Sequence, residues 1–168
     1  LIVKCFGERL VVDPMRPPYS FRDPAWKMRL TAGHSSVLID GKGHQYVDGH
    51  EGTNASQASA SIIRRGERDG YFFWTSDATR AYALVLPDVH SVTRTVVALT
   101  EPSALVIVDK IMKRSVPSTV QARFYAYNSD GKGTIAASQN SFMVTRPFAR
   151  LVGSASSDAG VTYKSSIP

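Results

Sequence analysis

Residues 92–99 read VTRTVVAL, and residues 104–111 read ALVIVDKI. In the first stretch, alternating polar and apolar residues give way to a continuous apolar run, which is typical of a strand that passes from the rim of a sheet into its core. Similar short segments, rich in β-branched and aromatic residues, recur between clusters of Gly, Pro, Asn and Asp. The sequence therefore predicts an all-β fold, an antiparallel β-sandwich.

The same pattern places the other elements. Two turns, DGKG at residues 40–43 and NSDG at residues 128–131, tolerate positive φ, and each is expected to close a hairpin. One short helix is expected after the N-cap Asp23 and Pro24. Strands are expected at residues 9–12, 36–39, 44–47, 59–64, 71–75, 82–86, 91–99, 105–111, 119–127, 134–137 and 141–145.

The chain length of 168 residues fits one domain with its own core. We expect the β-sandwich over residues 1–153 and a flexible C-terminal segment over residues 154–168. The chain opens on Leu1, Ile2 and Val3, without Met, as if a strand were already under way, which indicates a processed or incomplete polypeptide that lacks the first strands of the sandwich. The single cysteine, Cys5, excludes an intrachain disulfide.

A net charge of +6 favours polyanionic partners, which leaves acidic glycans, nucleic acid and anionic membranes open. The basic residues are scattered, and no recognition helix or aromatic platform is visible in the sequence, so nucleic acid is disfavoured. No apolar run approaches the roughly 20 residues that span a bilayer. We therefore expect neither nucleic acid nor a membrane as partner.

Several segments occur in an order that resembles a known family. They are GERLVVDP (residues 7–14), AGHSSVLIDG (32–41), YFFWTSDATRAY (71–82), and the pair TRTVV (93–97) and ALVIVDKI (104–111). In order and spacing these resemble the motifs of the heparinase II/III-like polysaccharide lyases. Ser35 and Ser36 replace the usual Asn-Thr, and Ser76 replaces Gly. The likeness covers about two thirds of the chain.

The resemblance implies an enzyme in which an N-terminal α/α toroid carries most of the catalytic groups and an antiparallel β-sandwich follows it. This chain resembles the sandwich, so the toroid of the same enzyme is an expected partner and no catalytic residue is assigned here. The family reaction is β-elimination, in which a base removes the C5 proton of a uronic acid and an acid assists the departing glycosidic oxygen. The implied substrate is an acidic polysaccharide, such as a glycosaminoglycan or alginate, and the implied location is periplasmic or secreted.

The resemblance also implies a structural zinc ion held by Asp13 and His34, with a third ligand from a His-x-His segment outside this chain. Zinc accepts imidazole nitrogen and carboxylate oxygen, and such a site ties separate chain segments together. Without the resemblance, Asp13 and Pro14 would form an ordinary strand-ending turn, and His34 would be a hydrogen-bonded structural histidine.

Four further residues are candidates for glycan binding. Arg64 and Arg65, in the run RRGER, suit sulfate or carboxylate groups, although such a run is usually a solvated turn. Tyr19 is a candidate for stacking on a sugar, although aromatic residues in a sandwich more often fill or cover the core. His50 lies in a small, polar loop where it can reach a glycan. The alternative function is a non-catalytic carbohydrate-binding β-sandwich.

Overall fold

The computed structural model describes residues 1–13, 19–20, 22–44, 58–83, 85–114, 117–139 and 141–165. Antiparallel strands dominate this part of the chain, which confirms the predicted all-β sandwich class. None of the helices described is long and apolar enough to cross a bilayer. Two compact units are present, which we call the terminal unit (Leu1–Arg16, Gly33–Ser36, Ala122–Pro168) and the central unit (Pro17–Ala32, Val37–Gln121).

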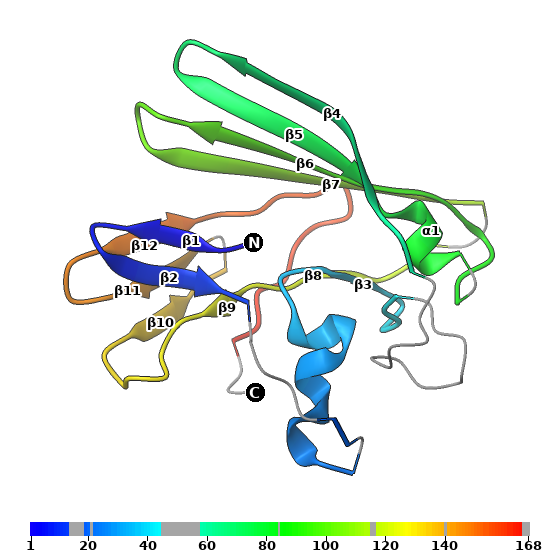
Figure 1. Ribbon diagram of the computed structural model, residues 1–168, viewed down its shortest axis with the longest axis horizontal. Helices are drawn as coiled ribbons and strands as arrows, with labels where there is room; N and C mark the ends of the chain where they lie inside the picture. The colour runs from blue at the N-terminus through cyan, green and yellow to red at the C-terminus, as the bar shows by residue number, and fades with distance from the viewer. Residues whose placement is uncertain are drawn as a thin grey trace. The chain divides into compact units, whose positions relative to one another are not determined.

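The terminal unit contains two three-stranded sheets, drawn in Figure 1. Buried Leu10, Val144 and Ala149 form its core, and partly buried side chains from both sheets, Cys5 among them, pack against these residues. The core therefore lies between the two sheets. The first sheet has the order β1 (Val3–Cys5), β2 (Glu8–Val12), β9 (Tyr125–Ala126), and the second β10 (Thr134–Ala137), β11 (Phe142–Thr145), β12 (Arg150–Gly153).

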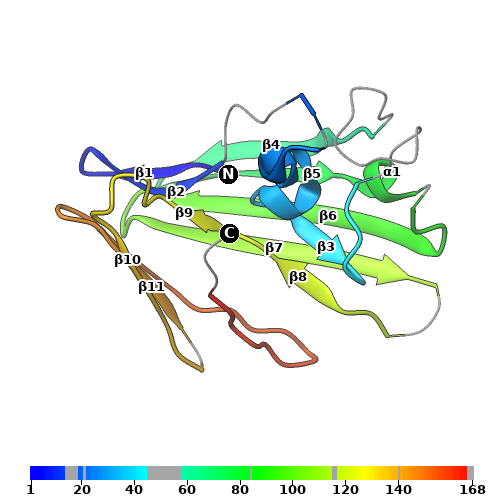
Figure 2. The ribbon, with the colours of Figure 1, turned by 90° about the horizontal axis from the view of Figure 1, so that it is seen from below.

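The central unit is built on a four-stranded antiparallel meander, whose strands lie side by side in chain order in Figure 2. A two-stranded sheet of β3 and β8 supplies β3 to one face of the meander, where Val37 and Ile39 pack with Val89 and Val92. The strands are β3 (Val37–Ile39), β4 (Ser61–Arg68), β5 (Tyr71–Asp77), β6 (Val89–Leu99), β7 (Ala104–Lys113) and β8 (Val120–Ala122).

The predicted helix start is confirmed. Asp23 is the N-cap of a 3-10 helix, η1 (Pro24–Arg29), and its Oδ1 accepts a hydrogen bond of 2.8 Å from the N–H of Ala25. A second 3-10 turn, η2 (Thr31–Gly33), follows directly. These two helical turns directly precede His34 in the sequence.

The strand predicted at residues 82–86 is wrong, because the chain forms the helix α1 (Thr79–Tyr82) there. Asp77 Oδ1 accepts hydrogen bonds from the Thr79 hydroxyl at 2.6 Å and from the Thr79 N–H at 2.8 Å, and these bonds start the helical turn. They also hold the pKa of the Asp77 carboxyl below its usual value. Of the apolar residues that suggested a strand, Tyr82 is buried at the end of α1 and Leu86 is buried four residues later.

The two predicted turns have different outcomes. At residues 40–43, Asp40 and Gly41 have φ values of 51° and 74°, and Ile39 bridges to Lys42, which confirms a tight turn. The turn at residues 128–131 closes no hairpin, because β9 pairs with β2 while β10 pairs with β11. Its loop is held internally, by a hydrogen bond of 2.7 Å from the Gly133 N–H to Asn128 Oδ1.

Other boundaries differ from the prediction in smaller ways. The single strand expected at residues 119–127 is two short strands, β8 and β9. The strand suggested by the opening residues 1–3 is β1, which runs from Val3 to Cys5, and the strand β12 was not predicted. The expected strand at residues 44–47 lies, apart from its first residue, outside the described residues. The domain boundary after residue 153 stays a prediction.

Candidate functional site

Asp13 and His34 lie in direct contact in the terminal unit. The Oδ1 atom of Asp13 is 2.7 Å from Nδ1 of His34, although the residues are 21 positions apart in the sequence. About a third of each side chain is exposed, 39% for Asp13 and 34% for His34. The structure therefore brings together the two residues predicted as zinc ligands and leaves both accessible from solvent.

Backbone contacts position this pair. Asp13 directly follows β2, and the short segment Gly33–Ser36 brings His34 beside it. The carbonyl of Ser36 accepts a hydrogen bond of 2.9 Å from the N–H of Arg123, two residues before β9, and β9 is the strand paired with β2. Gly33 and Ser35 are buried on either side of His34. The imidazole thus projects from a segment that is anchored next to the β2–β9 pair.

The donor set of the pair fits zinc. An imidazole nitrogen and a carboxylate oxygen that already lie within hydrogen-bonding distance are two of the ligands that Zn²⁺ takes in proteins. Within the described residues, no three His, Cys, Asp or Glu side chains gather closely enough to hold a metal. A zinc site here therefore needs ligands from elsewhere. The same contact also satisfies both side chains as a simple hydrogen bond, so metal binding at Asp13 and His34 stays a prediction.

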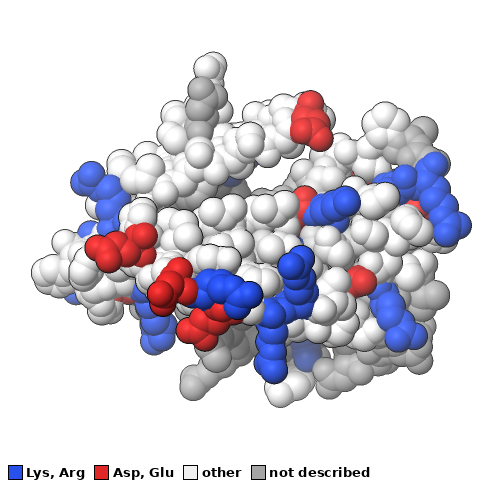
Figure 3. All heavy atoms as spheres, turned by 90° about the horizontal axis from the view of Figure 1, so that it is seen from above, with Lys and Arg blue, Asp and Glu red and all other residues white. Residues whose placement is uncertain are grey.

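The structure separates Arg64 from Arg65. Both are exposed on β4, where successive side chains point to opposite faces of the sheet, so they cannot hold one anion together. Arg64 lies over the ring of Phe73, 5.4 Å from its centroid. On the face drawn in Figure 3, basic side chains are interspersed with acidic ones and form no single basic patch.

Tyr19 is largely exposed, and its ring is not free for stacking on both faces. The guanidinium carbon of Arg29 lies 5.2 Å from the centroid of Tyr19 and 5.0 Å from that of Trp26, so Arg29 contacts both rings. His50, the remaining candidate for glycan binding, lies outside the described residues. Glycan binding by these residues stays a prediction.

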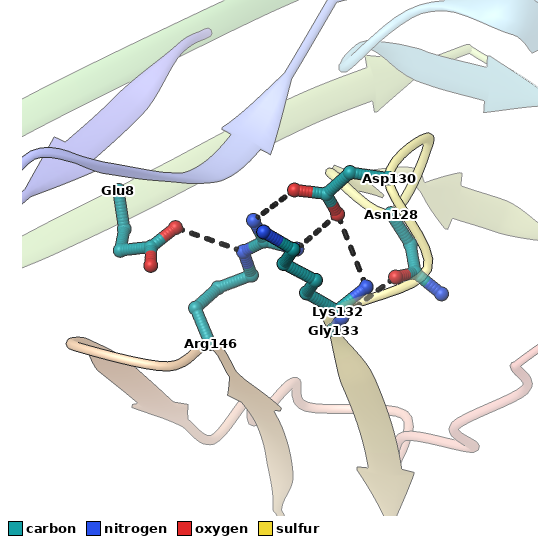
Figure 4. Close-up of polar contacts among 6 residues, drawn as sticks. All are labelled: Glu8, Asn128, Asp130, Lys132, Gly133 and Arg146. Atoms are coloured by element: carbon teal, nitrogen blue, oxygen red, sulfur yellow. Dashed lines mark hydrogen bonds and ion pairs between the residues drawn. The ribbon is translucent and has the colours of Figure 1, made fainter.

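One polar cluster in the terminal unit was not predicted from the sequence. Arg146, which is buried, donates through Nη1 and Nη2 to the two carboxylate oxygens of Asp130, each at 2.7 Å, and through Nε to Glu8 at 3.1 Å (Figure 4). Glu8 and Arg146 are 138 positions apart, and no spacing rule connects them. The cluster joins the start of β2, the loop at residues 128–131 and the end of β11.

The charges of this cluster stabilise one another. Hydrogen bonds from the Arg146 guanidinium, and a further one from the Lys132 N–H, hold the pKa of the Asp130 carboxyl well below its usual range. The Asp130 and Glu8 carboxylates in turn raise the pKa of Arg146. Arg146 therefore stays charged, and three of its N–H donors bond to two carboxylates.

The segments TRTVV and ALVIVDKI are neighbouring antiparallel strands, β6 and β7. Arg94 and Asp109 are directly opposed in their register. Two hydrogen bonds join them, from Nε to Oδ1 at 2.6 Å and from Nη2 to Oδ2 at 2.9 Å. The Arg and the Asp that characterise these two segments thus form a bidentate ion pair.

The comparisons with known proteins agree with the sequence resemblance. Residues 5–152 match the family model described as "Heparinase II/III-like, C-terminal", which includes Asp13, His34, Arg94 and Asp109. A search of curated proteins found no match. Because the family model spans most of the 168 residues, this chain belongs to the heparinase II/III-like family, whose C-terminal domain it represents.

Proposed function

We propose that this chain is the zinc-holding β-sandwich part of a polysaccharide lyase that cleaves acidic, uronate-containing glycans by β-elimination. Family membership over residues 5–152 supports the lyase class. The observation that carries the zinc proposal is the 2.7 Å contact between Asp13 Oδ1 and His34 Nδ1. A net charge of +6 suits a polyanionic substrate.

In this proposal Asp13 and His34 supply two of the zinc ligands. The bound ion would neutralise the carboxylate and cross-link the end of β2 to the segment Gly33–Ser36. Asp13 and His34 are positioned for this by β2 and by the hydrogen bond from the Arg123 N–H to the Ser36 carbonyl. Their role is to fix the shape of the sandwich.

The groups that remove the C5 proton and protonate the leaving oxygen are proposed to lie in an N-terminal toroid of the same enzyme, which is also the proposed partner of this chain. The chain alone would then be inactive, because none of its residues is assigned to proton transfer. We propose a periplasmic or secreted location, where acidic polysaccharides are met.

Product analysis of the complete enzyme tests this function. Heparin, heparan sulfate and alginate should be incubated separately with the enzyme, and the release of unsaturated uronates followed by ultraviolet absorbance. We expect at least one of these glycans to yield the unsaturated product, and this chain produced alone to yield none. Hydrolytic products without a double bond, or no product from any uronate-containing glycan, would contradict the lyase function.

A second candidate function is a non-catalytic carbohydrate-binding module. One observation favours it: the rings of Phe6 and Phe148 are exposed on the terminal unit. Neither ring is stabilised by burial in the folded chain, so both are available to stack on a sugar. The two functions differ in product formation, since a binding module retains glycan without forming unsaturated uronates.

A further inference from the structure

We propose that the terminal unit carries a saccharide-binding site between the tip of the β1–β2 hairpin and the turn between β11 and β12. The proposal goes beyond the lyase function, because it needs neither zinc nor the elimination reaction. Glu8, at the start of β2, and Asp13, just after its end, are about 16 Å apart at the rise of an extended strand, so this site is separate from the Asp13 and His34 pair.

A shallow depression of about 440 Å³ marks the site. Phe6 and Phe148 border it, and the charged groups of Glu8, Asp130, Lys132 and Arg146 line it. The tips of the two hairpins lie at the same end of the terminal unit in Figure 1 and Figure 2.

Phe6 has a backbone conformation that is unfavourable for a bulky side chain. Cys5 pairs with Glu8, so the hairpin loop has only two residues, Phe6 and Gly7, with φ values of 49° and 77°. Two-residue loops with positive φ at both positions favour Asn-Gly or Asp-Gly, and a bulky side chain is strained there. The Phe6 ring is also 82% exposed, so burial does not offset the strain. Residues kept in such a conformation cluster at ligand-binding sites.

Phe148 is a second exposed aromatic residue on a short turn. It follows Pro147 in a tight turn that is closed by a hydrogen bond of 2.8 Å from the Arg146 N–H to the Ala149 carbonyl, and it is 79% exposed. Because proline fixes one backbone angle of this short turn, the backbone that carries the ring has little conformational freedom. Both aromatic rings therefore stand on short, ordered turns, which lowers the entropy cost of binding a ligand.

The groups between the rings suit sugar hydroxyls and an acidic substituent. Arg146 fixes the carboxylates of Glu8 and Asp130, whose remaining lone pairs can accept hydrogen bonds from hydroxyl groups. Among the described residues, no side chain forms an ion pair with the ammonium group of Lys132, which is exposed and can therefore donate to a carboxylate or sulfate.

A saccharide fits these groups better than a protein partner does. A protein interface places its aromatic anchors in well-packed, desolvated pockets. Here the surface between the two rings is charged, and covering it with apolar side chains would desolvate Lys132 without a partner. A sugar ring instead places its apolar C–H face on Phe6 and Phe148 and its hydroxyls on the charged groups.

Calorimetric titration tests the proposal. The chain should be titrated with a hexamer of mannuronate and with maltohexaose as a neutral probe. We expect Phe6→Asn and Phe148→Ser each to weaken oligouronate binding at least tenfold. Lys132→Met should weaken binding of the oligouronate and leave that of maltohexaose within twofold. Ile2→Asn, which alters an exposed apolar residue of the same unit outside the depression, is the matched control and should bind as the wild type does.

Thermal unfolding of Phe6→Asn separates binding from structure. Asn-Gly is the preferred pair for this turn, so the variant should raise the midpoint of unfolding by about 2–4 °C while it loses affinity. Unchanged affinity in Phe6→Asn, or a wild-type chain that binds neither probe, would overturn the proposal. Self-association of the wild type that Phe6→Asn abolishes, in the absence of glycan binding, would overturn it in favour of a protein contact. His34→Ala should bind the oligouronate normally, so failure of the lyase proposal and failure of this site are distinguishable.

Discussion

Arg94 and Asp109 are opposed across β6 and β7, and two hydrogen bonds of 2.6 and 2.9 Å join the guanidinium to the carboxylate. Both side chains are mostly buried, at 18% and 15% exposure. Removing one member of such a pair leaves a poorly solvated charge, which costs much more than the pair itself contributes. A substitution at Arg94 or at Asp109 alone is therefore expected to destabilise the fold.

We expect Asp109→Asn to lower the free energy of unfolding by about 2 kcal/mol, because the Arg94 guanidinium keeps its charge and loses its charged acceptor. Urea unfolding followed by fluorescence measures this change. Lys110→Met, on the exposed neighbouring position of β7, should shift stability by less than about 0.5 kcal/mol. Equal losses of unfolding free energy in the two variants would show that the Arg94–Asp109 pair contributes no more to stability than an exposed position does.

The lowered pKa of the Asp130 carboxyl makes the free energy of unfolding depend on pH in the acid range. Its pKa is lowered in the folded chain by the Arg146 guanidinium, whereas in the unfolded chain it protonates near its ordinary value of about 3.9. The unfolded state therefore binds more protons below that pH, and the contribution of Asp130 to stability falls as the pH falls from about 5 towards the lowered folded pKa.

The measurement is urea unfolding at intervals between pH 7 and pH 2. We expect Asp130→Asn to be less stable than the wild type at pH 7 and to lose less stability on acidification, so the difference between the two narrows below about pH 4. A constant difference over the whole pH range would contradict this assignment.

Gly66 on β4 allows the Phe73 ring to lie against the neighbouring strand. A Cβ atom at Gly66 would lie 2.7 Å from the ring, closer than carbon atoms pack. We expect Gly66→Ala to displace the ring and to cost about 1 kcal/mol of stability. In a Phe73→Ala background the same substitution should cost much less, since the clash is gone. A double-mutant cycle measures this coupling, and additive effects would exclude it.

The parts of the fold that were predicted correctly depend on local signals. β5, β6 and β7 follow from β-branched and aromatic runs, and the 3-10 helix follows from its N-cap Asp23. No strand forms at residues 82–86, although their composition favours one, because the Asp77 side chain accepts hydrogen bonds from Thr79 and starts a helix just before them. That signal is local, because Asp77 and Thr79 are only two residues apart in the sequence.

Contacts between residues far apart in the sequence could not be predicted from such local signals. The loop at residues 128–131 has turn chemistry, but its flanking strands pair elsewhere, β9 with β2 more than a hundred residues earlier. Arg146 meets Glu8 across 138 residues, and no periodic pattern connects them. The Asp13 and His34 contact was anticipated only through the family resemblance, because a single aspartate and a single histidine 21 positions apart carry no spacing rule.

The zinc content of the complete enzyme tests the central claim most directly. We predict close to one zinc per chain by elemental analysis of the wild type, and strongly reduced zinc in both Asp13→Ala and His34→Ala, because each removes one of the paired donors. His90→Ala, at an exposed position of β6, is the matched control and should retain the metal. A wild-type enzyme without stoichiometric zinc, or a His34→Ala variant that keeps it, would contradict the account.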